Sequence, residues 1–375
     1  MISRSLCSFT AVVLLVGGAA ISASPALAAV RPEIGKALQA AQSDAAAGRC
    51  DSAKAQIRTA EGVGGKTGAE SQTIDQMKNY VDAKCGDANT AVGAKAKFAN
   101  DYNAGRYRAA IDDADLLRKF GALDGTNMLI IAQAYYKLGD YSGCVRYIKQ
   151  TFGSRGGQNE LELERRCAYE NGDTDTERAA LESLVASTGK PEYWDQLLDA
   201  ATKTKGLKDH QTLDIYRIKY MTGSIRKAED FKLLAELAIE NGDSAEAASV
   251  LQKAVSANVP GVAGNDRMLK LFNTAKAQAA TDAVNLSKTA EKASGDKLVE
   301  LGEMQWGAGK PQDTIKLVQS GLDKGVKDKD NAQIRLGMGY LSSGQKDAAV
   351  RAFNQARVDP KWEVIAHLWS LYARR

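Results

Sequence analysis

The sequence predicts an all-α solenoid of about nine helix pairs, and three observations support this fold class. Apolar residues recur at helical spacing, for example at Leu234, Leu237 and Ala238. Strand-like alternation of β-branched residues is absent, and the 375 residues include only six prolines. Glycine-centred turns recur along the chain at a nearly constant interval. Together these features are typical of stacked helix-turn-helix repeats.

Seven glycines mark the predicted turns. They lie at positions 105, 139, 172, 206, 242, 309 and 344, and the steps between them are 34, 33, 34, 36, 67 and 35 residues. A glycine just past a helix end adopts the left-handed backbone conformation, in which a side chain would be strained. The step of 67 residues indicates that one turn is missing or degenerate near residue 275.

Residues 1–28 have the composition of a secretory signal peptide. Arg4 provides a positive start, residues 9–21 form an uncharged and mostly apolar run, and Ala26-Leu27-Ala28 forms an A-x-A cleavage site. The apolar run is too short to span a bilayer as a helix, and no later run is long enough to do so. We therefore expect cleavage after Ala28 and a mature chain without a membrane-spanning helix.

The charge balance disfavours nucleic acid as a partner. Removing residues 1–28 removes Arg4 alone among the charged residues, which leaves 49 basic residues against 46 acidic ones. A nearly neutral balance provides no extended positive field for a phosphate backbone. The composition therefore favours other classes of partner.

Four cysteines remain after the predicted cleavage, namely Cys50, Cys85, Cys144 and Cys167. Export places them in an oxidising compartment, where paired cysteines usually form disulfides. Three connectivities are possible. We expect the sequential one, Cys50–Cys85 and Cys144–Cys167, because each repeat of an array contacts only its neighbours. No C-x-x-C motif is present and only two histidines occur, so we expect no metal site.

The segment from Gln333 to Pro360 resembles the tetratricopeptide repeat (TPR) family most clearly. Small and large residues follow the family pattern on both helices and at the turn, at Leu336, Gly337, Tyr340, Gly344, Ala349, Phe353 and Ala356. The match is partial elsewhere: Glu177 and Thr314 stand where the family has alanine. The resemblance covers roughly residues 91–360 and implies a right-handed solenoid. Because this repeat serves many purposes, it says little about function.

Four segments are expected along the chain. After the signal peptide of residues 1–28, residues 29–90 form an N-terminal helical cap, with a helix pair near 32–62 that turns at Gly48 and a helix near 70–84. Residues 91–359 form the repeat array. Residues 360–375 form a C-terminal capping helix, with Trp369 and Tyr372 on its inner face.

Motifs for catalysis or cofactor binding are not evident. Gly64-Gly65-Lys66-Thr67 lacks the first glycine of a phosphate-binding loop, because Ala60 occupies that position. No G-x-S-x-G or H-E-x-x-H motif occurs, and His210 is expected near the start of an exposed helix. We therefore expect no enzyme activity and no cofactor, although a pair of acids brought together by folding remains an alternative.

An aromatic residue lies three positions before the turn glycine in four repeats, at Tyr102, Tyr136, Tyr169 and Trp306. In the TPR family, the residue three positions before the turn glycine tends to face the concave surface, as do the residues one and two turns earlier on the same helix. The resemblance therefore implies a groove lined by Tyr136, Tyr169, Trp306, Gln133, Arg166, Glu236 and Glu303. Aromatic and polar residues of this kind suit an extended peptide or a sugar strand. Alternatively, the aromatics pack one repeat against the next.

The leading hypothesis is a non-enzymatic periplasmic scaffold or adaptor that binds a protein or peptide partner on its concave face. A receptor for a glycan or small molecule in the same groove is the second hypothesis, and an enzyme with an unrecognised site is the third. The periplasm is inferred from the signal peptide and from residues 190–260. That region resembles uncharacterised exported repeat proteins of Gram-negative bacteria.

Overall fold

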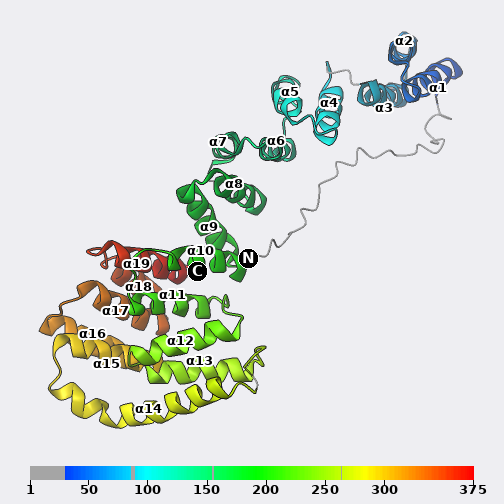
Figure 1. Cartoon of the computed structure of the whole chain (residues 1–375). Helices are drawn as coiled ribbons and strands as arrows, with labels where there is room; N and C mark the ends of the chain where they lie inside the picture. Colours follow the sequence, from blue (N-terminus) through cyan, green and yellow to red (C-terminus); the bar gives the residue numbers. More distant parts are fainter. Residues whose placement is uncertain (1–29, 86–88, 154–155, 263) are drawn as a thin grey trace. The chain divides into compact units, whose positions relative to one another are not determined.

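A computed structural model describes residues 30–85, 89–153, 156–262 and 264–375 (Figure 1). The predicted signal peptide and its cleavage site at Ala28 lie outside these residues. Within them the chain forms 19 α-helices and no strand, as the all-α prediction requires. None of the described helices combines the length and the apolar composition needed to cross a membrane.

The chain divides into two compact units. Unit 1 comprises residues 1–156 and 166–172, and unit 2 comprises residues 157–165 and 173–375, so the division lies within α8 (Gln158–Asn171). Both units are stacks of antiparallel helix pairs, which is the predicted solenoid architecture. Their division falls inside the predicted repeat array and not at the expected edge of the N-terminal cap near residue 90.

Unit 1 contains the first seven helices, and each packs on its neighbour in the chain. They are α1 (Pro32–Ala46), α2 (Cys50–Glu61), α3 (Gly68–Cys85), α4 (Ala91–Asn103), α5 (Tyr107–Lys119), α6 (Gly125–Leu138) and α7 (Tyr141–Thr151). The expected helix pair near 32–62 is present, and so is the helix near 70–84. Gly48 has a φ of 72° at the turn of that pair.

Unit 2 contains the remaining helices. They are α9 (Thr174–Thr188), α10 (Pro191–Thr202), α11 (Asp209–Met221), α12 (Ala228–Glu240), α13 (Ser244–Ser256), α14 (Asp266–Glu291), α15 (Gly295–Gly307), α16 (Pro311–Lys324), α17 (Lys329–Ser342), α18 (Lys346–Phe353) and α19 (Pro360–Ala373). The predicted C-terminal helix is α19, and Trp369 and Tyr372 pack into the core of unit 2 as expected.

All seven predicted turn glycines have a positive φ, between 71° and 89°. At Gly139, which follows α6, the backbone N–H of Asp140 donates to the carbonyl of Tyr135, and this closes the helix end. Asp140 then caps α7, because its carboxylate accepts from the backbone N–H of Gly143 at 2.9 Å. One turn thus ends a helix and begins the next. Local sequence therefore determines where the helices pair.

The missing turn near residue 275 is confirmed. The chain runs through this position as one helix, α14, which has 26 residues against 11 to 15 in the helices of most repeats. It lies against α13 and then contacts α15, so it passes from one helix pair to the next without a break (Figure 1).

Both cysteine pairs of the sequential connectivity are formed, and both lie in unit 1. Cys50 begins α2 and Cys85 ends α3, with a Cα–Cα distance of 5.4 Å. Cys144 of α7 and Cys167 of α8 have Cα atoms 6.1 Å apart, and both residues are buried. Each disulfide joins helices that are close in sequence, as the nearest-neighbour contacts of a repeat array require.

Unit 2 closes on itself. Its last helix, α19, contacts α11 and α17 in addition to its neighbour α18 (Figure 1). Its largest apolar cluster accordingly combines residues of α9, α10 and α11 with residues of α17, α18 and α19. Trp369 stacks on Phe353 with ring centroids 5.8 Å apart, and Tyr372 meets the edge of Trp194 at 6.1 Å. As a result, the inner sides of α11, α15 and α17 face one another.

Candidate binding site

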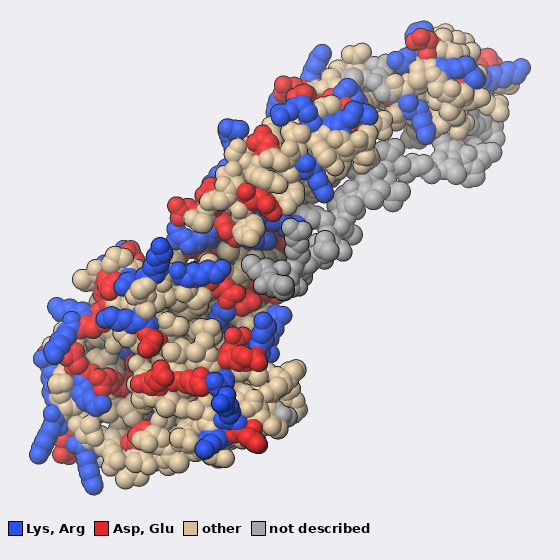
Figure 2. Space-filling view, in the orientation of Figure 1, with Lys and Arg blue, Asp and Glu red and all other residues tan. Residues whose placement is uncertain are grey.

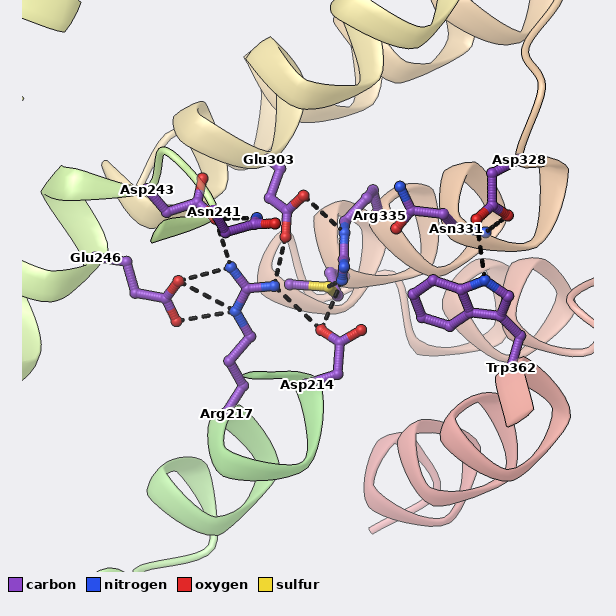
Figure 3. A network of polar contacts seen from close by, with 11 residues as sticks. Asp214, Arg217, Asn241, Asp243, Glu246, Glu303, Asp328, Asn331, Arg335 and Trp362 are labelled. Carbon is purple, nitrogen blue, oxygen red and sulfur yellow. Dashed lines mark hydrogen bonds and ion pairs between the residues drawn. The ribbon is translucent and has the colours of Figure 1, made fainter. Parts of the chain in front are cut away.

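Six charged residues meet in the interior of unit 2 (Figure 3). Asp214 and Arg217 come from α11, Asp243 and Glu246 from the start of α13, Glu303 from α15 and Arg335 from α17. All of them are buried, and we call this group the ion network. It occupies the space between the facing helices, where an open solenoid would present its inner surface to solvent.

Arg217 is the centre of the ion network. Its Nε and Nη2 donate to the carboxylate of Glu246, with a shortest distance of 2.6 Å, and Nη2 also donates to Asp243 at 2.9 Å. Its Nη1 donates to Glu303 at 2.5 Å and to Asp214 at 3.1 Å. A guanidinium has five N–H donors in a fixed planar arrangement. Arg217 can therefore hold acids from three different helices in one geometry.

Arg335 completes the ion network from the opposite side. Its Nη1 lies 2.6 Å from Asp214 Oδ1, and its Nε lies 2.9 Å from Glu303 Oε2. Asp214 and Glu303 each contact both arginines, so α11, α15 and α17 are linked through shared carboxylates. Because these groups are withdrawn from water, the loss of one partner would leave uncompensated buried charge.

The ion network contains four carboxyl groups and two guanidinium groups. Burial, followed by the nearby charge of Glu303, raises the pKa of Asp243 well above its usual value. Burial also acts to raise the pKa of Glu303, but the charges of Arg335 and Arg217 outweigh it and hold that pKa below its usual value. The raised pKa favours the protonated, neutral form of Asp243. This form reduces the excess negative charge of the ion network.

A cavity of about 620 Å³ adjoins the ion network in unit 2. Its walls come from α11, α13, α14, α15 and the turn after α15, and we call it the α14 cavity. The lining residues are Arg217, Tyr220, Met221, Ala245, Glu246, Ala248, Ser249, Val250, Lys276, Ala279, Trp306, Gly307, Ala308 and Gly309. Small residues form much of this wall. Its volume is within the range of ordinary ligand pockets.

Trp306 lines the α14 cavity and contacts a residue of a second cavity. Its ring lies over Arg217, with the guanidinium carbon 5.1 Å from the centroid, and its Nε1 donates to Ser342 at 2.8 Å. Ser342 lines the second cavity, of about 480 Å³, together with Tyr372 and Arg375. Met221 lines both cavities, so they are neighbours along one wall of unit 2.

The predicted groove residues are divided between the two units. In unit 1, Gln133 accepts a hydrogen bond from the Tyr102 hydroxyl at 3.1 Å, which joins α4 and α6. Tyr136 is half-buried, with its ring 5.5 Å from that of Tyr141. Arg166 is also half-buried, whereas Tyr169 is 64% exposed.

The other three groove residues lie in unit 2, in different surroundings. Trp306 lines the α14 cavity. Glu236 is half-buried on α12 and forms an ion pair with Lys232 at 2.8 Å. Glu303 is only 4% exposed and belongs to the ion network, so it is a buried structural residue and does not line an open groove. Trp306 and Glu303 are brought together, because both contact Arg217.

Five residues of the ion network were not identified from the sequence, namely Asp214, Arg217, Asp243, Glu246 and Arg335. A signal was present on α11. Asp214 and Arg217 lie among Leu213, Ile215 and Ile218, which are all fully buried. Charged residues on an apolar helix, where no exposed face remains for them, indicate buried ion pairs.

His210 was expected on an exposed helix, and this expectation is wrong. It does lie at the start of α11, but its ring is half-buried with a centroid 5.1 Å from the ring of Trp362. Burial lowers its pKa. The cause is the closure of unit 2, because α19 carries Trp362 and covers this end of α11.

Neither His210 nor the ion network forms a metal centre. Among the described residues, no group of three or more histidine, cysteine, aspartate or glutamate residues has the geometry of a metal site. The carboxylates of the ion network are held by arginine and buried. The site therefore offers an apolar cavity with a rigid polar floor, formed where Arg217 and Glu246 reach the α14 cavity.

The sequence matches no family model and no curated protein. Among solved structures, the chain is similar to the crystal structure of the P58(IPK) TPR domain, with 14% sequence identity. The alignment covers 91% of this chain and 97% of the other, with a TM-score of 0.23. Such a low score carries no argument by itself. The likeness to TPR repeats is carried by the helix pairs, the seven glycine turns and the sequence pattern of residues 333–360.

Proposed function

We propose that this protein is a non-enzymatic scaffold or adaptor of the periplasm that holds a protein or peptide partner. The α14 cavity is the observation that carries the proposal. It combines a wall of small residues with the rings of Trp306 and Tyr220, and the ion network beneath it keeps the wall in place. A preformed apolar cavity on a rigid helical frame suits the anchoring side chain of a partner.

The location in the periplasm is supported by two features. The amino-terminal sequence has the order of a secretory signal peptide, and the two cysteine pairs of unit 1 lie at bonding distance. Disulfides persist in oxidising compartments and are rare in the cytosol.

A protein or peptide partner is favoured over a glycan by the hydrogen bonds of the α14 cavity. Sugar recognition needs several polar groups that are available to hydroxyls. Here Trp306 Nε1 already donates to Ser342, and Arg217 and Glu246 bind each other. Nucleic acid is disfavoured as well, since positive and negative side chains are mixed over the visible face of each unit (Figure 2).

A cross-linking pull-down from the native cell envelope tests the proposal. We would compare the wild type with Trp306→Ala, with Tyr136→Ala/Tyr169→Ala, and with Val358→Ala as a control. Val358 is 84% exposed in unit 2 and lies outside both cavities. We expect a discrete protein that the wild type and the control recover and that at least one aromatic variant loses, with the helical circular-dichroism signal unchanged. If no protein is recovered, or every variant recovers the same one, the proposed sites are wrong.

A further inference from the structure

The chemistry of the α14 cavity indicates what kind of partner segment it accepts, provided that the protein holds a partner as proposed above. The first indication is the size of its wall residues. Ala245, Ala248, Ala279 and Ala308 leave its volume of about 620 Å³ open, which is space for more than one side chain. Tyr220, Met221, Val250 and Trp306 provide the larger apolar surfaces.

The second indication is that three polar side chains of the lining, those of Arg217, Glu246 and Trp306, already form hydrogen bonds within the protein. Arg217 and Glu246 are joined by three hydrogen bonds, and Trp306 Nε1 donates to Ser342. An occupant that needed hydrogen bonds from these groups would have to break contacts made within the protein. An apolar side chain needs none, and its burial is favourable by area alone.

The third indication is a positive charge without a matching acid. Lys276 lines the α14 cavity and lies over the ring of Phe272 at 5.2 Å. Lys253 lies over the ring of Tyr220, itself a lining residue, at 4.5 Å. Both lysines are exposed, and neither forms an ion pair with a carboxylate of the described residues. The acid of the lining, Glu246, is neutralised by Arg217.

The fourth indication is the second cavity, whose lining residue Ser342 contacts Trp306. It shares Met221 with the α14 cavity and presents the guanidinium of Arg375, which lies over the ring of Trp194 at 5.9 Å. A ligand that extends beyond one cavity therefore meets a second positive group. A single small molecule would use only one of the two spaces, whereas an extended chain can use both.

We propose that the α14 cavity binds an extended peptide segment of the partner in which an aromatic or large aliphatic side chain lies next to acidic residues. The apolar side chain enters the space between Val250 and Trp306. The neighbouring carboxylates face Lys276 and Lys253 at its rim. Apolar burial supplies most of the affinity, and the charges orient the segment.

Fluorescence anisotropy with synthetic peptides tests this proposal on the full mature chain. The parent peptide carries a phenylalanine flanked by aspartates in a glycine-serine background. Two matched peptides replace the phenylalanine by serine or the aspartates by asparagine. We expect the serine peptide to bind at least about tenfold more weakly. We expect the asparagine peptide to bind about three- to tenfold more weakly, with the difference shrinking as salt is added.

Variants of the protein test the same site from the other side. Ser249→Trp fills the cavity from an exposed position and should abolish binding, and Lys253→Gln/Lys276→Gln should reduce it about as much as the asparagine peptide does. Lys316→Gln, an exposed lysine on α16, is the control and should bind normally. Circular dichroism and thermal unfolding show that each variant remains folded.

Equal binding of the three peptides, or unchanged affinity in Ser249→Trp, would overturn the assignment of an acidic and aromatic segment. This failure can be distinguished from failure of the proposed function. If the pull-down still recovers a partner while these peptides do not bind, the protein is a scaffold that uses another surface or another peptide chemistry. If neither experiment gives binding, both proposals fail.

Discussion

The carboxylate of Asp214 lies 2.6 Å from Nη1 of Arg335, although the two residues are 121 positions apart in the sequence. The same oxygen accepts a hydrogen bond from Arg217, one turn further along α11. Asp214 therefore joins the middle of unit 2 to its carboxyl-terminal helices. α19 contacts both α11 and α17, the helices that carry these two residues, so the contact accompanies the closure of unit 2.

Replacing Arg335 by methionine should destabilise unit 2 by about 3–5 kcal/mol, because Asp214 and Glu303 would each lose a buried positive partner. The measurement is the free energy of unfolding in urea. Arg178→Met is the matched control, since the guanidinium of Arg178 is exposed where it pairs with Asp175 and Glu182, and its loss should change stability by less than about 1 kcal/mol. Equal effects of the two substitutions would contradict a stabilising role for the ion network.

Asp243→Asn should remove part of the pH dependence of stability. Burial raises the pKa of Asp243 in the folded state well above its usual value. Above the pKa of this aspartate in the unfolded state, the folded state therefore binds more protons than the unfolded state. Stability then falls as pH rises toward the folded pKa. Asparagine remains neutral, so the variant should gain stability relative to the wild type as pH increases. Urea unfolding between about pH 5 and pH 8 checks the sign, and parallel curves would show that Asp243 is ionised in the folded protein.

Gly337→Ala should destabilise unit 2 by about 1–3 kcal/mol, since a Cβ at this position would lie 2.3 Å from the ring of Phe353, which is fully buried. Gly125→Ala is the control. Gly125 opens α6 with no atom within 4 Å of the added carbon, and its substitution should be neutral or slightly stabilising. Thermal unfolding of both variants provides the comparison. A tolerated alanine at Gly337 would mean that the α17–α18 contact is looser than described.

Cys144→Ala/Cys167→Ala should lower the stability of unit 1 by about 2–5 kcal/mol, because the open chain gains conformational entropy when unfolded. Alkylation under denaturing conditions, followed by mass spectrometry, checks the pairing. We expect none of the four cysteines of the two pairs to react with the alkylating reagent before reduction. Peptides linking Cys50 to Cys144, or free thiols in protein purified without a reducing agent, would contradict the sequential connectivity.

His367 should contribute stability at low pH that is lost as pH rises. Its Nε2 lies 3.1 Å from Glu182, and this hydrogen bond raises the pKa of the imidazole above its usual value. The contribution is therefore present below the unfolded pKa of about 6.5 and disappears as pH rises through the folded pKa. Because His367 is half exposed, the effect should stay below about 1 kcal/mol. The His367→Gln variant should lose this pH-dependent contribution to stability. His210, whose pKa is lowered by burial, is present in both proteins and does not affect the comparison between them.

The repeat architecture could be predicted because its signals are local. Each turn glycine has to adopt a positive φ, and Gly139 with Asp140 shows that two adjacent residues end one helix and cap the next. The cysteine pairing followed from the same logic, since neighbouring helices touch whatever the curvature of the array is. The aromatic register on a concave face stays a prediction, and the Tyr102–Gln133 hydrogen bond shows only that two of its residues in unit 1 are in contact.

The sequence by itself determined the helices and their pairing, because backbone geometry and apolar spacing act over one or two turns of helix. Only the tertiary structure decided that unit 2 closes, that Glu303 lies in its interior and that Trp306 lines a cavity. Closure depends on small rotations between successive repeats that add up along the array. No single residue determines the sum of these rotations. That sum places Asp214 beside Arg335.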